Sequence, residues 1–246
     1  MSRIELLAVE GLPEINAGDD LAALIAAAAD QRLASDDLLV VAHKVISKAE
    51  GSVVELADVK PSPRAIELAE RQGRDPRQVE VILQQSAEVI RDVGELLVCR
   101  THHGFICANA GVDGSNSGGD SRLVLLPRDP DASARALRAA LPGHPAVMIT
   151  DSFGRAWRLG QVDVAIGLAG LRPLDDWRGG TDREGRALSA TLIAVADQAA
   201  AAADLARTKD GACPAVIVRG LGRLISADDG PGAQALLRPA SEDRFL

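Results

Sequence analysis

Apolar residues in this chain gather in short runs that are separated by polar segments of uneven length. Runs of this kind, ended by turn-forming residues, are typical of buried strands. Strands are therefore expected at residues 4–9, 38–42, 96–101, 105–108, 122–126, 146–149, 162–169 and 215–218. Helices are indicated where a capping residue or a proline precedes a longer stretch with helical patterning. These stretches are residues 18–31, a segment after Pro63, and residues 76–86, 132–140 and 189–205.

The order of these elements decides the expected fold class. Strands and helices alternate irregularly, and no internal repeat, low-complexity tract or linker divides the chain. The regular alternation that predicts a doubly wound parallel sheet is absent. We therefore expect an α+β fold of mixed sheets with flanking helices. Residues 1–246 would form one domain, and the pattern leaves open where the boundaries between two interleaved subdomains would fall.

Composition narrows the kinds of core and of partner. Hydrophobic residues make up 47% of the 246 residues, whereas aromatic residues make up 2% and tyrosine is absent. The core must therefore be built mainly from Ala, Val, Leu and Ile. The 27 basic and 35 acidic residues give a net charge of −8. An acidic chain with few aromatic side chains lacks the basic surface and the stacking platforms of nucleic-acid-binding proteins, so no nucleic-acid partner is expected.

The cysteines and the apolar stretches bear on where the protein works. Cys99, Cys107 and Cys213 are odd in number and widely spaced, which argues against a disulfide framework and against a zinc site. The most apolar stretch, residues 192–206, is interrupted by acidic residues, so no membrane span is expected. The N-terminus has no signal-peptide pattern. These features predict a cytoplasmic protein whose cysteines are small, buried and reduced.

Two polar segments that follow apolar runs carry the residues best suited to chemistry. They are residues 100–116 and 149–161, which contain Asp113 and Asp151 respectively. The carboxylates of these aspartates and the hydroxyl of Ser152 are hard oxygen ligands of the kind that Mg²⁺ and Mn²⁺ prefer. Two plainer interpretations stay open. Asp113 precedes a glycine and so suits a hairpin turn, and Asp151 suits a helix cap.

Basic residues near these segments are candidates for contact with a phosphate. Arg155 and Arg158 are three residues apart, so on a helix both would project from one face as a clamp for phosphate or carboxylate. A solvated arginine face is the alternative. Lys44 and Lys48 follow the expected strand 38–42, where a lysine can neutralise phosphate charge. For Lys44 a surface position is favoured.

The histidines fit contact roles better than a metal site. His43 closes the strand 38–42, either as a hydrogen-bond donor to a phosphate or as a polar strand end. His102 and His103 are adjacent, so on a strand they would face opposite sides. Neither has a cysteine or acidic partner at metal-ligand spacing, which leaves His103 as a structural or substrate-contacting residue. The chain contains neither GxxxxGK[ST] nor GxGxxG after a strand, so a bound nucleotide would need another architecture.

Several segments together resemble the coenzyme F420-0:L-glutamate ligase family, in the same order from the first strand to the C-terminus. The matching stretches are residues 9–14, 43–48, 50–51, 103–116, 150–161, 214–220 and 236–239. The resemblance implies the α+β fold of that family. It also implies contacts with a guanine nucleotide from Leu12, Pro13, Glu14, Ile15, Lys48 and Asn116. Relatives often carry a serine where this chain has His43, whose imidazole would replace the hydroxyl as the contact.

The same resemblance implies metal and catalytic roles. Asp113 and Asp151 would be ligands of one divalent ion, Mg²⁺ or Mn²⁺, and Ser152 a ligand of a second. Lys48 would act in catalysis beside the two aspartates. Residues 208–213 resemble a further nucleotide-contacting loop, and participation of K⁺ is left open. Contacts with the substrate would come from Arg155, Arg158 and His103.

The activity implied by the resemblance is GTP-dependent amide formation. L-glutamate would be joined to the lactyl carboxylate of coenzyme F420-0 through an acyl phosphate, and addition of further γ-linked glutamates is left open. The partners would be GTP, L-glutamate and coenzyme F420-0, and the protein would be a homodimer. Two alternatives remain: a ligase on the same scaffold that acts on another acid, and a nucleotide- or deazaflavin-binding protein without catalysis. Phosphate release from GTP distinguishes the last of these from a ligase.

Overall fold

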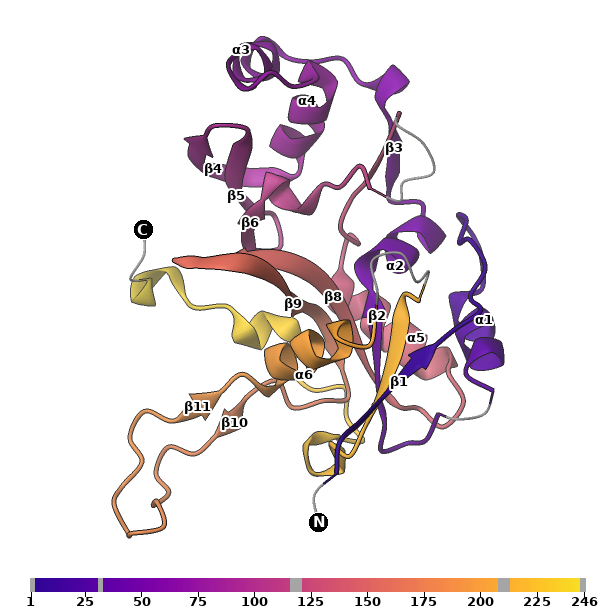
Figure 1. Cartoon of the computed structure of the whole chain (residues 1–246), viewed down its shortest axis with the longest axis vertical. Helices are drawn as coiled ribbons and strands as arrows, with labels where there is room; N and C mark the ends of the chain where they lie inside the picture. The colour runs from indigo at the N-terminus through magenta and orange to yellow at the C-terminus, as the bar shows by residue number, and fades with distance from the viewer. Residues whose placement is uncertain (1–2, 31–32, 116–120, 208–212, 244–246) are drawn as a thin grey trace.

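The computed structural model describes residues 3–30, 33–115, 121–207 and 213–243. At its centre lies a five-stranded sheet of order β1–β12–β2–β8–β9 (Figure 1). β2 and β8 run parallel, whereas the other neighbouring pairs are antiparallel. The strands are β1 (Glu5–Val9), β12 (Ala215–Arg219), β2 (Leu38–Ala42), β8 (Ala146–Arg155) and β9 (Arg158–Ala169).

Helices cover both faces of this sheet. Successive residues of a strand point to opposite faces, and β2 shows the consequence. Its residues Leu39 and Val41 pack with α1 and α5, whereas Leu38 and Val40 pack with α6. Since both faces are buried, β2 is apolar throughout, as is typical of a strand between two layers. The three helices are α1 (Leu21–Ala28), α5 (Pro130–Ala140) and α6 (Val195–Asp204).

A smaller unit is inserted in the chain between α2 and α5 and lies at the top of Figure 1. Its helices α3 and α4 pack on a three-stranded sheet of order β4–β5–β6, and the pair β3–β7 stands beside them. Both helices begin as their sequences predict, with a side-chain cap followed by proline. The elements are α2 (His43–Ala49), β3 (Val53–Glu55), α3 (Pro63–Gln72), α4 (Pro76–Gln84), β4 (Ser86–Val93), β5 (Leu96–Thr101), β6 (Ile106–Ala108) and β7 (Arg122–Val124).

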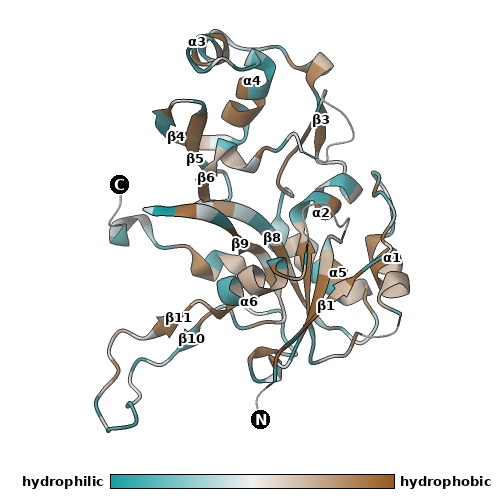
Figure 2. Ribbon diagram, viewed as in Figure 1, coloured by the Kyte–Doolittle hydropathy of each residue, from teal (hydrophilic) through white to brown (hydrophobic). Residues whose placement is uncertain are grey.

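A two-stranded arm projects from the larger unit at the lower left of Figure 1. It consists of β10 (Asp175–Asp176) and β11 (Leu192–Ile193), which pair antiparallel. Figure 2 shows that the apolar residues concentrate in the central strands, whereas the tip of this arm is hydrophilic. The outer end of the β8–β9 hairpin is mixed in character, with Trp157 and Leu159 exposed. The arm and the hairpin end therefore reach into solvent, away from the core.

The α+β class is confirmed, with mixed sheets and flanking helices, and the core is aliphatic as the composition predicts. The extents of several elements are wrong: the strand expected at 162–169 begins at Arg158, and the helix expected at 18–31 spans Leu21–Ala28. In three further elements the pairing of strands explains the difference. The helix expected at 189–205 begins only at Val195, because the residues before it pair as β11. The helix expected at 76–86 ends at Gln84, and β4 follows at once. The strand expected at 146–149 continues to Arg155 because it pairs with β9 along its polar end.

The apolar stretch at 192–206 forms a strand and a helix rather than one long segment. Among the residues that the structure describes, no helix has both the length and the apolar character needed to cross a bilayer.

Asp131 joins three elements from inside the core, and its removal tests how tightly they are held. Its carboxylate oxygen Oδ1 accepts hydrogen bonds of 2.8 Å from the backbone N–H groups of Leu168 and Ala233, and the residue is 8% exposed. Asp131→Ala leaves both donors buried without a partner, so we expect it to lower the free energy of unfolding by about 3 kcal/mol. Urea denaturation measures the loss.

A matched control lies two residues earlier in the same helix. Asp129 is exposed and caps α5 by accepting from Ala132 N at 2.9 Å. Asp129→Ala removes an exposed cap, which costs about 1 kcal/mol. Equal losses for the two variants would contradict a structural role for the buried carboxylate of Asp131.

Candidate functional site

A cavity of about 930 Å³ opens where β2 ends and β8 continues. Ala42 is the last residue of β2 and pairs with Thr150, so beyond Thr150 that edge of β8 has no neighbouring strand within the part of the chain that the structure describes. Side chains from both faces of β8 can therefore reach the same open space. The cavity is lined by Leu12, Pro13, Glu14, Ile15, Ala42, His43, Lys44, Val45, Lys48, Asp113, Ser115, Thr150, Asp151, Ser152, Gln161, Asp163, Asp204, Arg207, Cys213 and Pro214.

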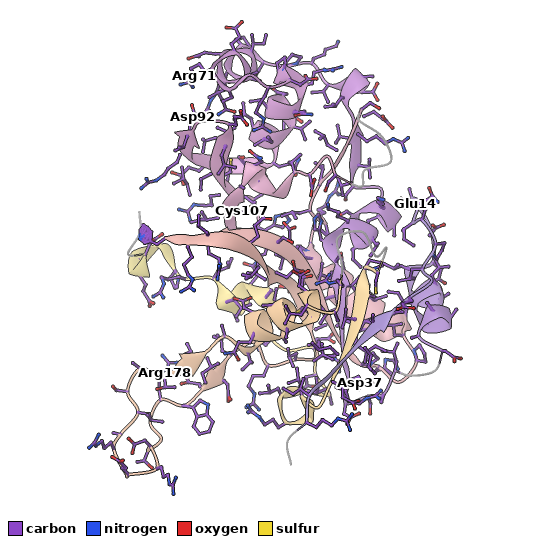
Figure 3. All side chains as sticks on the ribbon, in the orientation of Figure 1. Glu14, Asp37, Arg71, Asp92, Cys107 and Arg178 are labelled. Atoms are coloured by element: carbon purple, nitrogen blue, oxygen red, sulfur yellow. The ribbon has the colours of Figure 1, made fainter. Side chains whose placement is uncertain are left out.

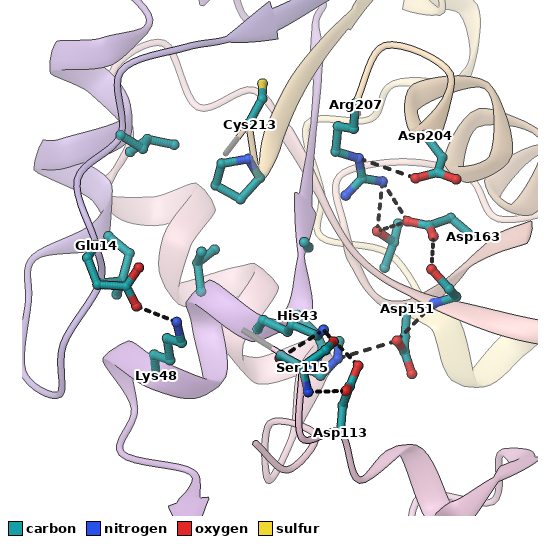
Figure 4. Close-up of a pocket in the computed structure, with 18 of the residues that line it drawn as sticks. Glu14, His43, Lys48, Asp113, Ser115, Asp151, Asp163, Asp204, Arg207 and Cys213 are labelled. Atoms are coloured by element: carbon teal, nitrogen blue, oxygen red, sulfur yellow. Dashed lines mark hydrogen bonds and ion pairs between the residues drawn. The ribbon is translucent and has the colours of Figure 1, made fainter. Parts of the chain in front are cut away.

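Figure 4 shows the arrangement of the charged side chains. Lys48 and Glu14 lie on one side of the view, and Asp163, Asp204 and Arg207 lie on the opposite side. His43, Asp113, Ser115 and Asp151 lie between them, and Cys213 lies above this group in the view. The site thus combines carboxylates and cations that come from distant parts of the chain.

Helix α2 presents the two lysines because it starts directly after β2. Lys44 and Lys48 are four residues apart and so share one face of the helix. The side chain of Lys48 is only 11% exposed, and its ammonium pairs with the carboxylate of Glu14, which is 72% exposed. The apolar stem of Lys48 is therefore buried while its charge faces the mouth of the cavity.

The predicted surface position for Lys44 is wrong. Its side chain is 22% exposed, and its Nζ lies 2.7 Å from the carboxylate of Asp113 and 2.7 Å from the hydroxyl of Ser115. The helix faces the returning chain of the inserted unit, so Lys44 is covered by a segment more than sixty residues away. That neighbour could not be foreseen from the local sequence.

Asp113 is held by its backbone as well as by Lys44. It forms a two-way bridge with Val124, through hydrogen bonds of 3.0 and 2.8 Å. Burial alone would raise the pKa of the Asp113 carboxyl, but the hydrogen bonds from Lys44 and from Ser115 N outweigh it and hold that pKa below its ordinary value. Asp113 is therefore a carboxylate at neutral pH.

Asp151 is a further carboxylate that lines the cavity. Its carboxylate accepts from Ser152 N at 2.8 Å and is 16% exposed. His43 Nε2 lies 3.3 Å from Asp151 Oδ1, close enough for an ion pair but not aligned as a hydrogen bond. The ring of His43 is 2% exposed, with Nδ1 3.4 Å from Ser47 Oγ. His43 thus contacts the candidate metal ligand Asp151 from within the core.

The opposite face of β8 carries Thr150 and Ser152, which point to a buried carboxylate on β9. Asp163 is 4% exposed and accepts from Thr150 Oγ1 and from Ser152 Oγ, each at 2.7 Å. Arg207 donates to the same carboxylate at 2.5 Å. Sequence analysis missed Thr150, Asp163 and Arg207. A charged residue inside the apolar run 162–169 was the available signal for Asp163.

Cys107 lies close enough to Asp151 to respond to its charge. Burial, and then the negative charge of Asp151, raise the pKa of the Cys107 thiol to about 12. Because this pKa lies far above pH 8, the thiol stays protonated there and we expect it to resist iodoacetamide in the native protein. Peptide mass spectrometry checks this, with urea-unfolded protein as the control in which Cys107 reacts. Rapid native alkylation of Cys107 would contradict the environment described.

Three of the predicted substrate contacts lie outside the cavity lining. Arg155 and Arg158 are not on a helix: they face each other across the β8–β9 hairpin, because β8 pairs with β9 to its polar end. Arg155 donates to Leu159 O within that turn. The Nε2 of His103 contacts the carbonyl oxygens of Pro127 and Arg128 at 3.0 and 3.1 Å, so His103 supports a loop.

The other predicted positions divide into two groups. Asn116 and residues 208–212 lie outside the described residues. The ten that line the cavity are Leu12, Pro13, Glu14, Ile15, His43, Lys48, Asp113, Asp151, Ser152 and, from the loop predicted at 208–213, Cys213. Their roles remain predictions, but the structure brings them to one place.

Fold and site together define an α+β protein with a polar, carboxylate- and lysine-lined cavity at the end of a parallel strand pair. The family model described as F420-0:Gamma-glutamyl ligase matches residues 11–220. The chain therefore belongs to the F420-0:gamma-glutamyl ligase family.

Relatives match over nearly the whole chain. A coenzyme F420:L-glutamate ligase of Methanothermobacter thermautotrophicus is 47% identical over 252 residues, covering 98% of each chain. A protein of the same name from Methanopyrus kandleri is 43% identical over all of both chains. One from Halobacterium salinarum is 44% identical, covering 96% of this chain and 93% of its own.

Proposed function

We propose that this protein is a ligase that joins the amine of L-glutamate to the terminal carboxylate of a coenzyme F420 precursor, using GTP. One observation carries the proposal: Asp113, Asp151 and Lys48 line a single cavity in a chain whose relatives are named coenzyme F420:L-glutamate ligases. The distance between these residues along the sequence makes their convergence informative. A turn or a helix cap would not require it.

The proposed chemistry activates a poor electrophile. A carboxylate oxygen of the precursor attacks the γ-phosphorus of GTP, and the bond from that phosphorus to the β–γ bridging oxygen breaks, releasing GDP. The glutamate amine then attacks the acyl carbon of the acyl phosphate. The carbon–oxygen bond to phosphate breaks, inorganic phosphate leaves, and the nitrogen loses a proton. Lys44 and Lys48 supply fixed positive charge beside the phosphates, which lowers the cost of the charge that develops.

The cavity residues fit a divalent cation with hard-ligand preference. Asp113 and Asp151 offer carboxylate oxygens and Ser152 offers a hydroxyl, all on the cavity wall. Within the described residues no cluster of three or more His, Cys, Asp or Glu could hold a metal without help. Mg²⁺ commonly takes one or two carboxylates and completes its shell with phosphate oxygens and water, so nucleotide and protein would share the ligands. When bound, the cation neutralises phosphate charge and orients the γ-phosphoryl group.

A direct test follows the two products. Purified protein is incubated with GTP, Mn²⁺, L-glutamate and the F420 precursor, and each component is omitted in turn. We expect phosphate release only in the complete mixture, together with a mass increase of the deazaflavin that equals one added glutamyl residue. Full GTP consumption without a deazaflavin product would favour a ligase for another acid. Absence of phosphate release in every mixture would favour a binding protein and would refute the proposal.

A further inference from the structure

A buried aspartate–arginine pair lies in the wall of the cavity, next to the candidate metal ligand Ser152. Arg207 Nη2 and Asp163 Oδ2 are 2.5 Å apart, and their side chains are 8% and 5% exposed. Asp163 belongs to β9, whereas Arg207 follows the end of α6. The pair therefore ties a helix end to the strand that lines the site.

Stability does not account for such a pair. Removing two charges from water can cost more than their attraction returns, and an apolar pair of similar volume often stabilises a core equally well. What a buried charged pair does supply is a fixed direction for the groups bonded to it. Here those groups are two hydroxyls of β8, Thr150 and Ser152.

The hydroxyls of Thr150 and Ser152 differ in their hydrogen bonds. Thr150 Oγ1 donates to Asp163 at 2.7 Å and accepts from Arg207 Nη2 at 3.2 Å, so it is engaged as donor and as acceptor. Ser152 Oγ donates to Asp163 Oδ1 at 2.7 Å. A hydroxyl has one proton and two lone pairs. With that proton turned to Asp163, Ser152 offers its lone pairs to the cavity that it lines.

We propose that Asp163, held by Arg207, is a positioning residue that makes the Ser152 hydroxyl an acceptor facing the cavity, ready to bind a hard divalent cation. This inference rests on the proposed function, because the cation would be shared with the nucleotide. Asp163 does not touch the cation in this scheme. It acts through the direction of a single O–H bond.

The substitution Asp163→Asn tests that direction with little change of volume. Arg207 only donates, so it holds the oxygen of the new amide on its own side. The amide nitrogen then falls on the side of Ser152 and donates to Oγ. That bond takes up a lone pair of Ser152 and turns its proton toward the cavity, where it repels a cation. The acceptor is thus converted to a donor at an unchanged position.

The measurement is Mn²⁺ affinity of the protein–GTP complex, from electron paramagnetic resonance of free Mn²⁺. We expect Asp163→Asn and Ser152→Ala each to weaken Mn²⁺ binding about tenfold or more, the usual effect of losing a partner of a metal ligand. Because Asp163 acts through Ser152, the double variant should bind Mn²⁺ no more weakly than Ser152→Ala alone. Additive losses in the double variant would overturn the proposal.

A matched control exists at the other end of the sheet. Asp37 is fully buried and pairs with Arg219 at 2.9 and 2.8 Å, just before β2 begins. Figure 3 labels Asp37 in the lower right part of the molecule, below Cys107, and Asp37 does not line the cavity. Asp37→Asn perturbs a buried pair of the same kind, so we expect lower thermal stability with unchanged Mn²⁺ affinity. Loss of Mn²⁺ affinity in this control would show that the effect is only structural.

Two further measurements distinguish failure of the positioning role from failure of the proposed function. Should Asp163→Asn fail to fold, Arg207→Gln releases the same carboxylate. It is expected to weaken Mn²⁺ binding in the wild-type background and to have no effect in the Ser152→Ala background; an equal effect in both would overturn the proposal. If the wild-type protein with GTP binds no Mn²⁺, the proposed function fails. If it binds Mn²⁺ and Asp163→Asn binds equally well, only the positioning role fails.

Discussion

Asp151→Asn should lower turnover by roughly a thousandfold or more, because it removes a full negative charge from the wall that faces the phosphates and their cation. The substitution is close to isosteric. Its remaining oxygen can still accept the hydrogen bond from Ser152 N that orients the side chain. The fold should therefore survive while the charge does not. Phosphate release in the complete reaction mixture, at several Mn²⁺ concentrations, measures the loss.

Two further variants test whether the loss of turnover is specific to the cavity. Asp113→Asn should behave in the same way, since Asp113 is the other carboxylate proposed to bind the cation in this cavity. Asp176→Asn is the control: Asp176 lies on β10, outside the cavity lining, and pairs with Arg178. We expect it to leave turnover unchanged. Near-wild-type turnover in Asp151→Asn and Asp113→Asn at low Mn²⁺ would contradict the assignment of both residues.

Much of the candidate site could be anticipated because polar residues follow apolar runs at strand ends. The turn at 12–15 and the start of α2 follow β1 and β2, whereas Asp113 is itself a bridge residue and Asp151 lies on the polar end of β8. The structure brings all of them to one cavity. The sequence predicted many of the residues that line the cavity. It did not predict why they meet, which depends on β8 continuing past the end of β2.

Other parts of the site depend on pairing that no local pattern records. Arg155 and Arg158 have the spacing of a helix face, yet Arg155 pairs with Arg158 across a hairpin. Pairing with β9 satisfies backbone groups along one edge of this polar stretch of β8, and that outweighs the local signal. The contact of Arg207 could not be predicted from the local sequence either, because its partner Asp163 is 44 residues away.

The inserted unit explains why the predicted surface position of Lys44 is wrong. The local pattern favours a surface position for Lys44, and in an isolated α2 that prediction would hold. The insertion returns through Asp113 and Ser115, whose oxygens then surround the ammonium. Lys44 therefore gains its environment from a segment that folds back on it. The hydrophobic pattern predicts where elements lie, but contacts between units follow from their docking.

Lys48→Met should lower kcat/KM for GTP by roughly a hundredfold, the effect of removing one preorganised positive group from beside a developing charge. The side chain of Lys48 is only 11% exposed, so methionine can fill the volume of its apolar stem. The loss would then reflect charge rather than packing. Steady-state kinetics with GTP as the varied substrate measure it, and the KM for L-glutamate should change little.

Lys60→Met provides the comparison, because Lys60 is exposed and lies outside the cavity lining. Both variants remove one positive charge, so any effect of net charge on the acidic protein is the same in each. A hundredfold loss confined to Lys48→Met would therefore be a local effect on the nucleotide. If kcat/KM for GTP were the same in Lys48→Met and Lys60→Met, the pairing of Lys48 with Glu14 would be structural. Lys44 would then be the lysine that neutralises the phosphate charge.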